Sequence, residues 1–304
     1  MALLEELTAP AAADRHEVRF RAMGTDCHVV VLGGGPADAD VAVERVRELE
    51  SHWSRFLDHS DIGRLNAADG RPVVVAAPTR VLLERAVEAR TRTKGWFDPF
   101  MADSLRAAGY DRDFSRLTPA EVGPGTEDRP RARPAIGQPL FRRAPISIGA
   151  PDGSGGATVR LSGGATFDPG GIGKGLAADI VAVELVAEGA AGALVNLGGD
   201  LRVAGAAPPD GWAVSIDHPV DRTLPPVATV HLAGAGLCTS SALPRRRRAP
   251  DGARSHHLPS PPTTRPPRIA GGRNHIGGRY GIARLERGAR RHVDDAGDVQ
   301  HRIC

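Results

Sequence analysis

The periodic pattern of apolar residues, on which any folded core depends, stops near residue 243. From Pro244 to Cys304 the chain is rich in Arg, Pro, Gly and His and holds only isolated Ile and Leu. Such a segment has too few apolar side chains to form an element that faces a core. We therefore predict a flexible N-terminus at 1–16, one folded domain at 17–243 and a disordered basic tail at 244–304.

Two kinds of periodicity alternate within the predicted domain. Residues 17–32 alternate apolar and polar side chains, as in a half-buried pair of strands. Apolar residues from Val46 to Phe56 recur at spacings of three and four, as on one face of a helix. The same criteria predict helices at 36–56, 78–95 and 174–188 and further strands at 73–76, 193–197, 212–216 and 227–232. This mixed order, with few βαβ units, favours an α+β fold with mixed and antiparallel sheets and packed helices.

Three segments are predicted to be turns or irregular structure. The polar stretch 59–70 is expected to be a loop, and residues 112–150, rich in Pro, Gly, Arg and Glu, a long surface excursion. Residues 157–168 are expected to form a hairpin whose arms flank Ser162-Gly-Gly164.

The basic character of the chain comes from its C-terminal part alone. From Pro244 onward there are 14 arginines and 5 acidic residues, a net charge of +9, which leaves −6 for residues 1–243. Arg245 to Arg248 are suited to contact nucleic-acid phosphates. Tyr280 is the one aromatic residue in the tail, so base stacking lacks support. We expect no nucleic-acid partner.

The cysteines and the hydropathy of the chain indicate its cellular location. Three cysteines lie far apart, at Cys27, Cys238 and Cys304, so neither a disulfide framework nor a CxxC metal site is predicted. No window approaches the ~20 apolar residues of a membrane span, and the N-terminus lacks an apolar signal region. We therefore expect free thiols, no membrane span and a cytoplasmic protein.

A glycine-rich turn, Phe167-Asp-Pro-Gly-Gly-Ile-Gly-Lys-Gly175, precedes the helix predicted at 174–188. Its glycines permit close approach of a ligand, and a helix N-terminus with Lys174 favours an anion. Asp168 and Gly175 stand where a P-loop needs Gly and Ser or Thr, and a dinucleotide fingerprint fits little better. The segment is thus either a phosphate site of another kind or a tight strand-to-helix turn.

Seven segments together resemble the FAD:protein FMN transferase family, ApbE, over about residues 18–258. The matching segments are Met23-Gly-Thr25, Trp53-Ser-Arg-Phe56 with Asp61-Ile-Gly-Arg-Leu-Asn66, Thr93-Lys-Gly-Trp-Phe-Asp-Pro99, Asp168 to Asp179, Asn196-Leu-Gly-Gly-Asp200, Thr239-Ser240, and His256-His-Leu258. The resemblance implies contacts with FAD by Met23, Phe56, Trp96, Phe97, Asp98, Asp168, Lys174 and Leu258. It also implies that the Gly171 carbonyl binds Mg2+ and that His257 is the catalytic base. Asn66 is suited to bind the ligand or to cap its own turn, and Asp179 to bind or to pair with an arginine.

The implied reaction is Mg2+-dependent transfer of FMN from FAD to a Thr or Ser hydroxyl of a target protein, with release of AMP. After Leu258, however, the family's Ile-Asp-Pro-x-Thr-Gly and Ala-Asp-x-x-x-Thr segments do not follow. We hypothesise a change of reading frame near codon 258 and expect weak or absent transfer by this chain. The alternatives are an FAD-binding protein without transfer and an FAD pyrophosphatase, in which water replaces the hydroxyl.

Overall fold

In a computed structural model the chain forms two compact units. The described residues are 15–95, 97–107, 127–128, 144–217, 223–226, 228–239, 246–248, 253–256, 291–292 and 301–303. Unit 1 comprises residues 1–50, 174–240 and 283–304, and unit 2 comprises residues 51–173 and 241–282. Within the described ranges, none of the helices combines the length and the apolar character needed to cross a membrane.

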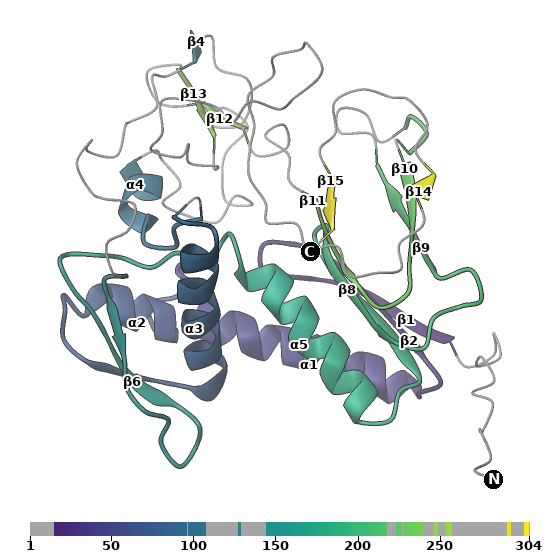
Figure 1. The fold of residues 1–304 in the computed structure, drawn as a ribbon, viewed down its shortest axis with the longest axis horizontal. Coiled ribbons are helices and arrows are strands. Elements are labelled where there is room, and N and C mark those ends of the chain that lie inside the picture. Colours follow the sequence, from purple (N-terminus) through teal and green to yellow (C-terminus); the bar gives the residue numbers. More distant parts are fainter. Residues whose placement is uncertain are drawn as a thin grey trace. The chain divides into compact units, whose positions relative to one another are not determined.

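Unit 1 is built on a six-stranded sheet (Figure 1) with the order β1-β2-β7-β8-β11-β15. Its strands are β1 Arg15–Ala22, β2 Thr25–Leu32, β7 Gly192–Leu197, β8 Asp200–Gly205, β11 Gly236–Thr239 and β15 His301–Ile303. All neighbours are antiparallel. A second sheet, β14-β10-β9, consists of Arg291–His292, Ala228–Leu232 and Trp212–Ile216.

The six-stranded sheet buries apolar side chains on both faces. On one face Val30, Leu194 and Val203 form a cluster with Trp212 and Leu232 of the smaller sheet. On the other face of β2, Val29 and Val31 are fully buried. Helix α5 (Gly173–Ala187) approaches this sheet so closely that a side chain at Gly205 would meet Val186. Helix α1 (Pro36–Trp53) contacts α5 through a bidentate ion pair, in which Arg45 donates two hydrogen bonds to the Glu184 carboxylate.

The described residues of unit 2 form three helices and two small sheets. The helices are α2 Asp61–Ala67, α3 Ala77–Arg92 and α4 Ala102–Ala107. The sheets are β3-β6-β5 (Val73–Val75, Ala157–Leu161, Ile146–Ile148) and β12-β13-β4 (Arg246–Arg248, Ala253–His256, Glu127–Asp128). The predicted α+β class, with antiparallel and mixed sheets and packed helices, is confirmed.

Asp61 fastens three segments of unit 2 together. Its carboxylate, almost wholly buried, accepts hydrogen bonds from Thr79 Oγ1 at 2.7 Å and from the Ala76 N–H at 3.0 Å. Arg64 binds the other oxygen, and His52 Nδ1 lies 3.2 Å from Oδ2. One side chain therefore joins the end of α1, the start of α2 and the junction of β3 with α3.

Two local predictions were wrong. The stretch 59–70 contains helix α2, which begins after the N-cap Ser60 and buries Ile62 and Leu65. The predicted hairpin at 157–168 does not form, because β6 pairs with the distant β3 and β5 and no strand is present at 165–168. Strands β8 and β11 and helix α4 were not predicted.

The predicted tail at 244–304 is described only at four short strands, β12 to β15. At these strands the backbone is extended and paired, which differs from the predicted disorder. The rest of the tail and residues 1–14 lie outside the described residues, as does most of the excursion at 112–150. The predicted division into segments 1–16, 17–243 and 244–304 stays a prediction.

Candidate active site

The turn that carries Asp168 lies in unit 2 and is held from several sides. The Asp168 N–H donates to the Pro99 carbonyl at 2.8 Å, and its carboxylate lies 2.9 Å from Arg55 Nε. Burial raises the pKa of Asp168, while Arg55 and the Gly170 N–H oppose that rise. The carboxylate is thus a buried group with its own cationic partner rather than a free ligand for a metal.

Phe97 and Gly171 are in direct contact. A Cβ at Gly171 would come within 2.9 Å of the Phe97 ring, so only glycine permits this approach of backbone to ring. The Phe97 N–H donates to Thr93 Oγ1 at 3.0 Å, at the end of α3. Two of the predicted site residues, one aromatic and one in the glycine-rich turn, therefore lie together.

Asp98 and Phe56 are both engaged by arginines. Asp98 accepts from the Phe100 N–H at 3.0 Å and lies 3.3 Å from Arg90 Nε. The Arg55 guanidinium lies 4.4 Å from the centre of the Phe56 ring, whose residue is 39% exposed. A large aromatic side chain that stays this exposed beside a cation offers a face for stacking.

Lys174, in the first turn of α5, belongs to unit 1 and forms an ion pair with Asp200. Both side chains are about one-fifth exposed. The unpaired backbone N–H groups at a helix N-terminus favour an anion. No acidic side chain in the first turn of α5 competes for them. Asp200 holds the ammonium group beside this helix end.

Met23 lies at the tip of the β1–β2 hairpin with a left-handed backbone, φ 51°, followed by Gly24 at φ 67°. Positive φ at both central residues is the type I′ turn, which usually carries Asn-Gly. The Met23 N–H donates to Glu50 Oε1 at 2.7 Å, which fixes the turn to α1. Methionine at this position costs backbone strain, which is a mark of functional turns.

A second turn of unit 1 packs against this hairpin tip. A Cβ at Gly198 would lie 2.1 Å from Thr25 Oγ1, and the Thr239 N–H donates to the Gly199 carbonyl at 2.9 Å. The segments around Met23, Asp200 and Thr239, far apart in the chain, thus meet at one end of the six-stranded sheet.

The remaining predicted residues have varied outcomes. Trp96, His257 and Leu258 lie outside the described residues. Asp179 lies 3.8 Å from Arg202 Nε, which agrees with the structural interpretation of an arginine pair. Cys27 is a free thiol, as predicted, and burial raises its pKa to about 11.

Sequence reasoning missed two residues that hold predicted site residues. Arg55 and Asp200 pair with Asp168 and Lys174 but were given no role, although both stand inside the quoted segments. The sequence signal that could have indicated these pairs is that residues of opposite charge stand in different segments of the same family pattern. Their pairing depends on contacts over 113 and 26 positions of sequence, which no local pattern reveals.

The predicted Mg2+ ligand, the Gly171 carbonyl, has little support from its surroundings. The described residues hold no group of three or more His, Cys, Asp or Glu side chains that would bind a metal. Asp168, the nearest acid in sequence, is paired with Arg55. Since Mg2+ takes several oxygen ligands, the described residues do not fit this ion.

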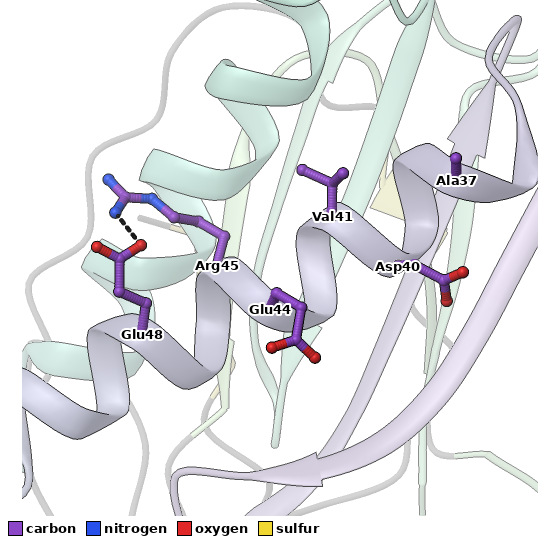
Figure 2. Close-up of a pocket in the computed structure, with 6 residues that line it drawn as sticks. All are labelled: Ala37, Asp40, Val41, Glu44, Arg45 and Glu48. Atoms are coloured by element: carbon purple, nitrogen blue, oxygen red, sulfur yellow. Dashed lines mark hydrogen bonds and ion pairs between the residues drawn. The ribbon is translucent and has the colours of Figure 1, made fainter.

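A shallow hollow on the exposed face of α1 is a different feature (Figure 2). It is lined by Ala37, Asp40, Val41, Glu44, Arg45 and Glu48. Arg45 pairs within it with Glu48, as the dashed line shows. None of the predicted site residues lines this hollow, so it is not a candidate for the flavin.

Comparisons with known proteins agree on one family. A model of the ApbE family matches residues 23–270. A curated relative, the FAD:protein FMN transferase of Treponema pallidum (strain Nichols), is 31% identical over 263 residues, which cover 79% of this chain and 68% of that protein. The enzyme of the same name from Rhodobacter capsulatus is 29% identical over 269 residues, 86% of this chain and 48% of that protein. This chain therefore spans about half the length of the Rhodobacter relative.

Solved structures show the same fold. An ApbE protein of Thermotoga maritima has a TM-score of 0.63 at 24% identity, covering 80% of this chain and 75% of its own. The flavin transferase ApbE of Vibrio cholerae has a TM-score of 0.59 at 19% identity, covering 83% of this chain and 78% of its own. These structures show the fold, and the family-model match over residues 23–270 with the 31% identical relative shows that the chain belongs to the ApbE family.

Proposed function

We propose that this protein binds FAD and belongs, by its chemistry, to the enzymes that transfer FMN from FAD to a Thr or Ser hydroxyl of a target protein. The observation that carries the proposal is the Asp168–Gly175 segment. Within unit 2, a largely buried carboxylate is paired with an arginine and a glycine lies against the Phe97 ring. Within unit 1, the first turn of α5 carries the cation Lys174. These features suit a ligand that has both a flat ring and phosphates.

The proposed reaction is one displacement at phosphorus. His257 accepts the proton of the target hydroxyl, and the oxygen forms a bond to the FMN phosphorus of FAD. The bond from that phosphorus to the AMP oxygen breaks, and AMP leaves. Lys174, with the N-terminus of α5, stabilises the pyrophosphate charge, and Asp168, Phe56 and Phe97 orient the flavin.

The test separates binding from transfer. Purified protein is titrated with FAD and followed by quenching of flavin fluorescence. It is then incubated with FAD, Mg2+ and a target domain, and covalent flavin is read in a denaturing gel. We expect saturable FAD binding with weak or absent labelling, because the family's C-terminal segments are absent from this sequence. Protein that is folded but has no affinity for FAD would overturn the proposal.

Two outcomes of this assay identify the alternatives. Bound FAD with neither labelled target nor free AMP would favour a flavin-binding protein without transfer. Release of AMP and FMN without a labelled target would favour a pyrophosphatase. Labelling at the rate of a relative with complete C-terminal segments would contradict the expected loss of transfer.

Metal removal tests whether FAD binding depends on Mg2+. The resemblance implies an Mg2+-dependent reaction, whereas the described residues offer the Gly171 carbonyl and no acidic cluster. We therefore expect the Kd for FAD to change by less than about twofold between excess Mg2+ and EDTA. Ca2+ serves as the control for ionic strength. A tightening of tenfold or more by Mg2+ alone would contradict this expectation.

A further inference from the structure

Asn66, at the last full turn of α2, binds the backbone of Phe167 with both ends of its side-chain amide. Its Nδ2 donates to the Phe167 carbonyl at 2.8 Å, and the Phe167 N–H donates to Oδ1 at 2.7 Å. The two residues are 101 positions apart in the sequence. The side chain thus acts on Phe167 as a neighbouring strand would, although no strand is present there.

This contact differs from both functions that the sequence suggested for Asn66. A residue that caps its own turn bonds to backbone within a few positions, whereas Asn66 bonds to another segment. Each polar atom of the amide makes one hydrogen bond to Phe167, which fixes the orientation of the side chain and leaves one N–H and one lone pair of the amide for other partners. Its effect on the site therefore passes through Phe167.

Phe167 transmits the position of Asn66 directly to Asp168. Its side chain is fully buried and meets the Phe100 ring edge-on, with centroids 5.9 Å apart. The next residue, Asp168, is held by the Pro99 carbonyl and by Arg55. With the Phe167 peptide groups fixed on one side and Asp168 on the other, the start of the glycine-rich turn has little freedom.

We propose that Asn66 is a positioning residue for FAD, which sets the Asp168 turn through the backbone of Phe167. The inference rests on the proposed function, since FAD is the ligand whose affinity it changes. Without the amide, the buried N–H and carbonyl of Phe167 lose their partners, and buried unpaired groups drive a local rearrangement. The Asp168 carboxylate then leaves the position in which Arg55 holds it.

The experiment compares Asn66→Ala with a matched control in the same unit. Ala86→Gly lies in the interior of α3, is fully buried, and lowers helix stability without touching the Asp168 turn. For wild type and both variants, the Kd for FAD is measured together with the urea midpoint. Hydrogen exchange of peptides spanning residues 165–170 is followed without FAD.

For Asn66→Ala we expect the Kd for FAD to rise about tenfold or more and the Phe167 amide to exchange faster. Ala86→Gly should lower the urea midpoint yet leave the Kd within about twofold. Asn66→Asp keeps the acceptor for the Phe167 N–H but sets a carboxylate oxygen against the Phe167 carbonyl, so its Kd should rise at least as much as that of Asn66→Ala.

Two results would overturn the positioning role. One is an equal change in Kd for Asn66→Ala and Ala86→Gly, which would reduce Asn66 to general stability. The other is unchanged exchange at 165–170 in Asn66→Ala. A wild-type protein that fails to bind FAD would instead overturn the proposed function and this inference with it, so the two failures are distinct.

Discussion

Replacing Asp61 by alanine is expected to lower the free energy of unfolding by about 3–5 kcal/mol, the range for breaking a buried charged network. The change removes the acceptor for Thr79 Oγ1, the Ala76 N–H and Arg64. The Thr79 hydroxyl then stays fully buried without this partner and the Ala76 N–H partly buried, which costs more than the lost bonds alone. Urea denaturation followed by circular dichroism measures the loss.

The contribution of Asp61 should also depend on pH. Burial raises the pKa of this carboxyl, but hydrogen bonds from Thr79, the Ala76 N–H and Arg64 outweigh it, so the pKa lies below its ordinary value. A group whose pKa is lower in the folded state stabilises above its unfolded pKa, about 3.9 for Asp. That contribution is lost as the pH falls through the folded pKa.

Asp61→Asn is the control for shape. The Asn side chain keeps one oxygen that can accept hydrogen bonds, but it carries no charge and replaces the other oxygen by an NH2 group. Its contact with Arg64 is therefore weaker, and the loss of unfolding free energy should be smaller than for alanine. The gap in stability between wild type and Asp61→Ala should narrow below about pH 4. A gap that stays constant from pH 7 to pH 3 would contradict this account.

Gly198→Ala should be the second most damaging change, with a loss of about 2–5 kcal/mol. Its φ of +68° costs an alanine about 1–2 kcal/mol. The new Cβ would also lie 2.1 Å from Thr25 Oγ1 and 2.8 Å from Thr25 Cβ, so the Met23 hairpin or the Asp200 turn must move, at about 1–3 kcal/mol. Thermal or urea unfolding measures the sum.

Gly163→Ala isolates the backbone part of this effect. Its φ of +66° matches that of Gly198, but nothing lies within 4 Å of the added Cβ. The excess loss at Gly198 over Gly163 therefore reports the steric contact. Thr25→Gly should recover part of that excess in the double variant, with a coupling of at least about 1 kcal/mol. Equal losses at the two glycines would show that the contact with Thr25 is unimportant.

Elements with strong periodicity could be predicted from the sequence. The alternation at 17–32 became β1 and β2, and helices predicted at 78–95 and 174–188 became α3 and α5. Helix α2 was missed because it has seven residues, too few for a periodic signal. Its stability comes from tertiary contacts such as those of Asp61, which no local window contains.

The family's segments could be recognised from the sequence, including Asn66 and the turn at Asp168, but the contacts between them could not. That Asn66 binds the backbone of Phe167, or that Arg55 pairs with Asp168, depends on contacts about a hundred positions apart. Such pairings are decided by packing rather than by local preference.

The left-handed Met23 has a consequence for protein engineering. Asparagine or glycine tolerates that backbone better, so a redesign ranked by folding stability would choose one of them at the hairpin tip. Such a protein would have a higher free energy of unfolding and would lack the thioether side chain of Met23. A library screened for heat resistance alone would therefore discard this methionine early.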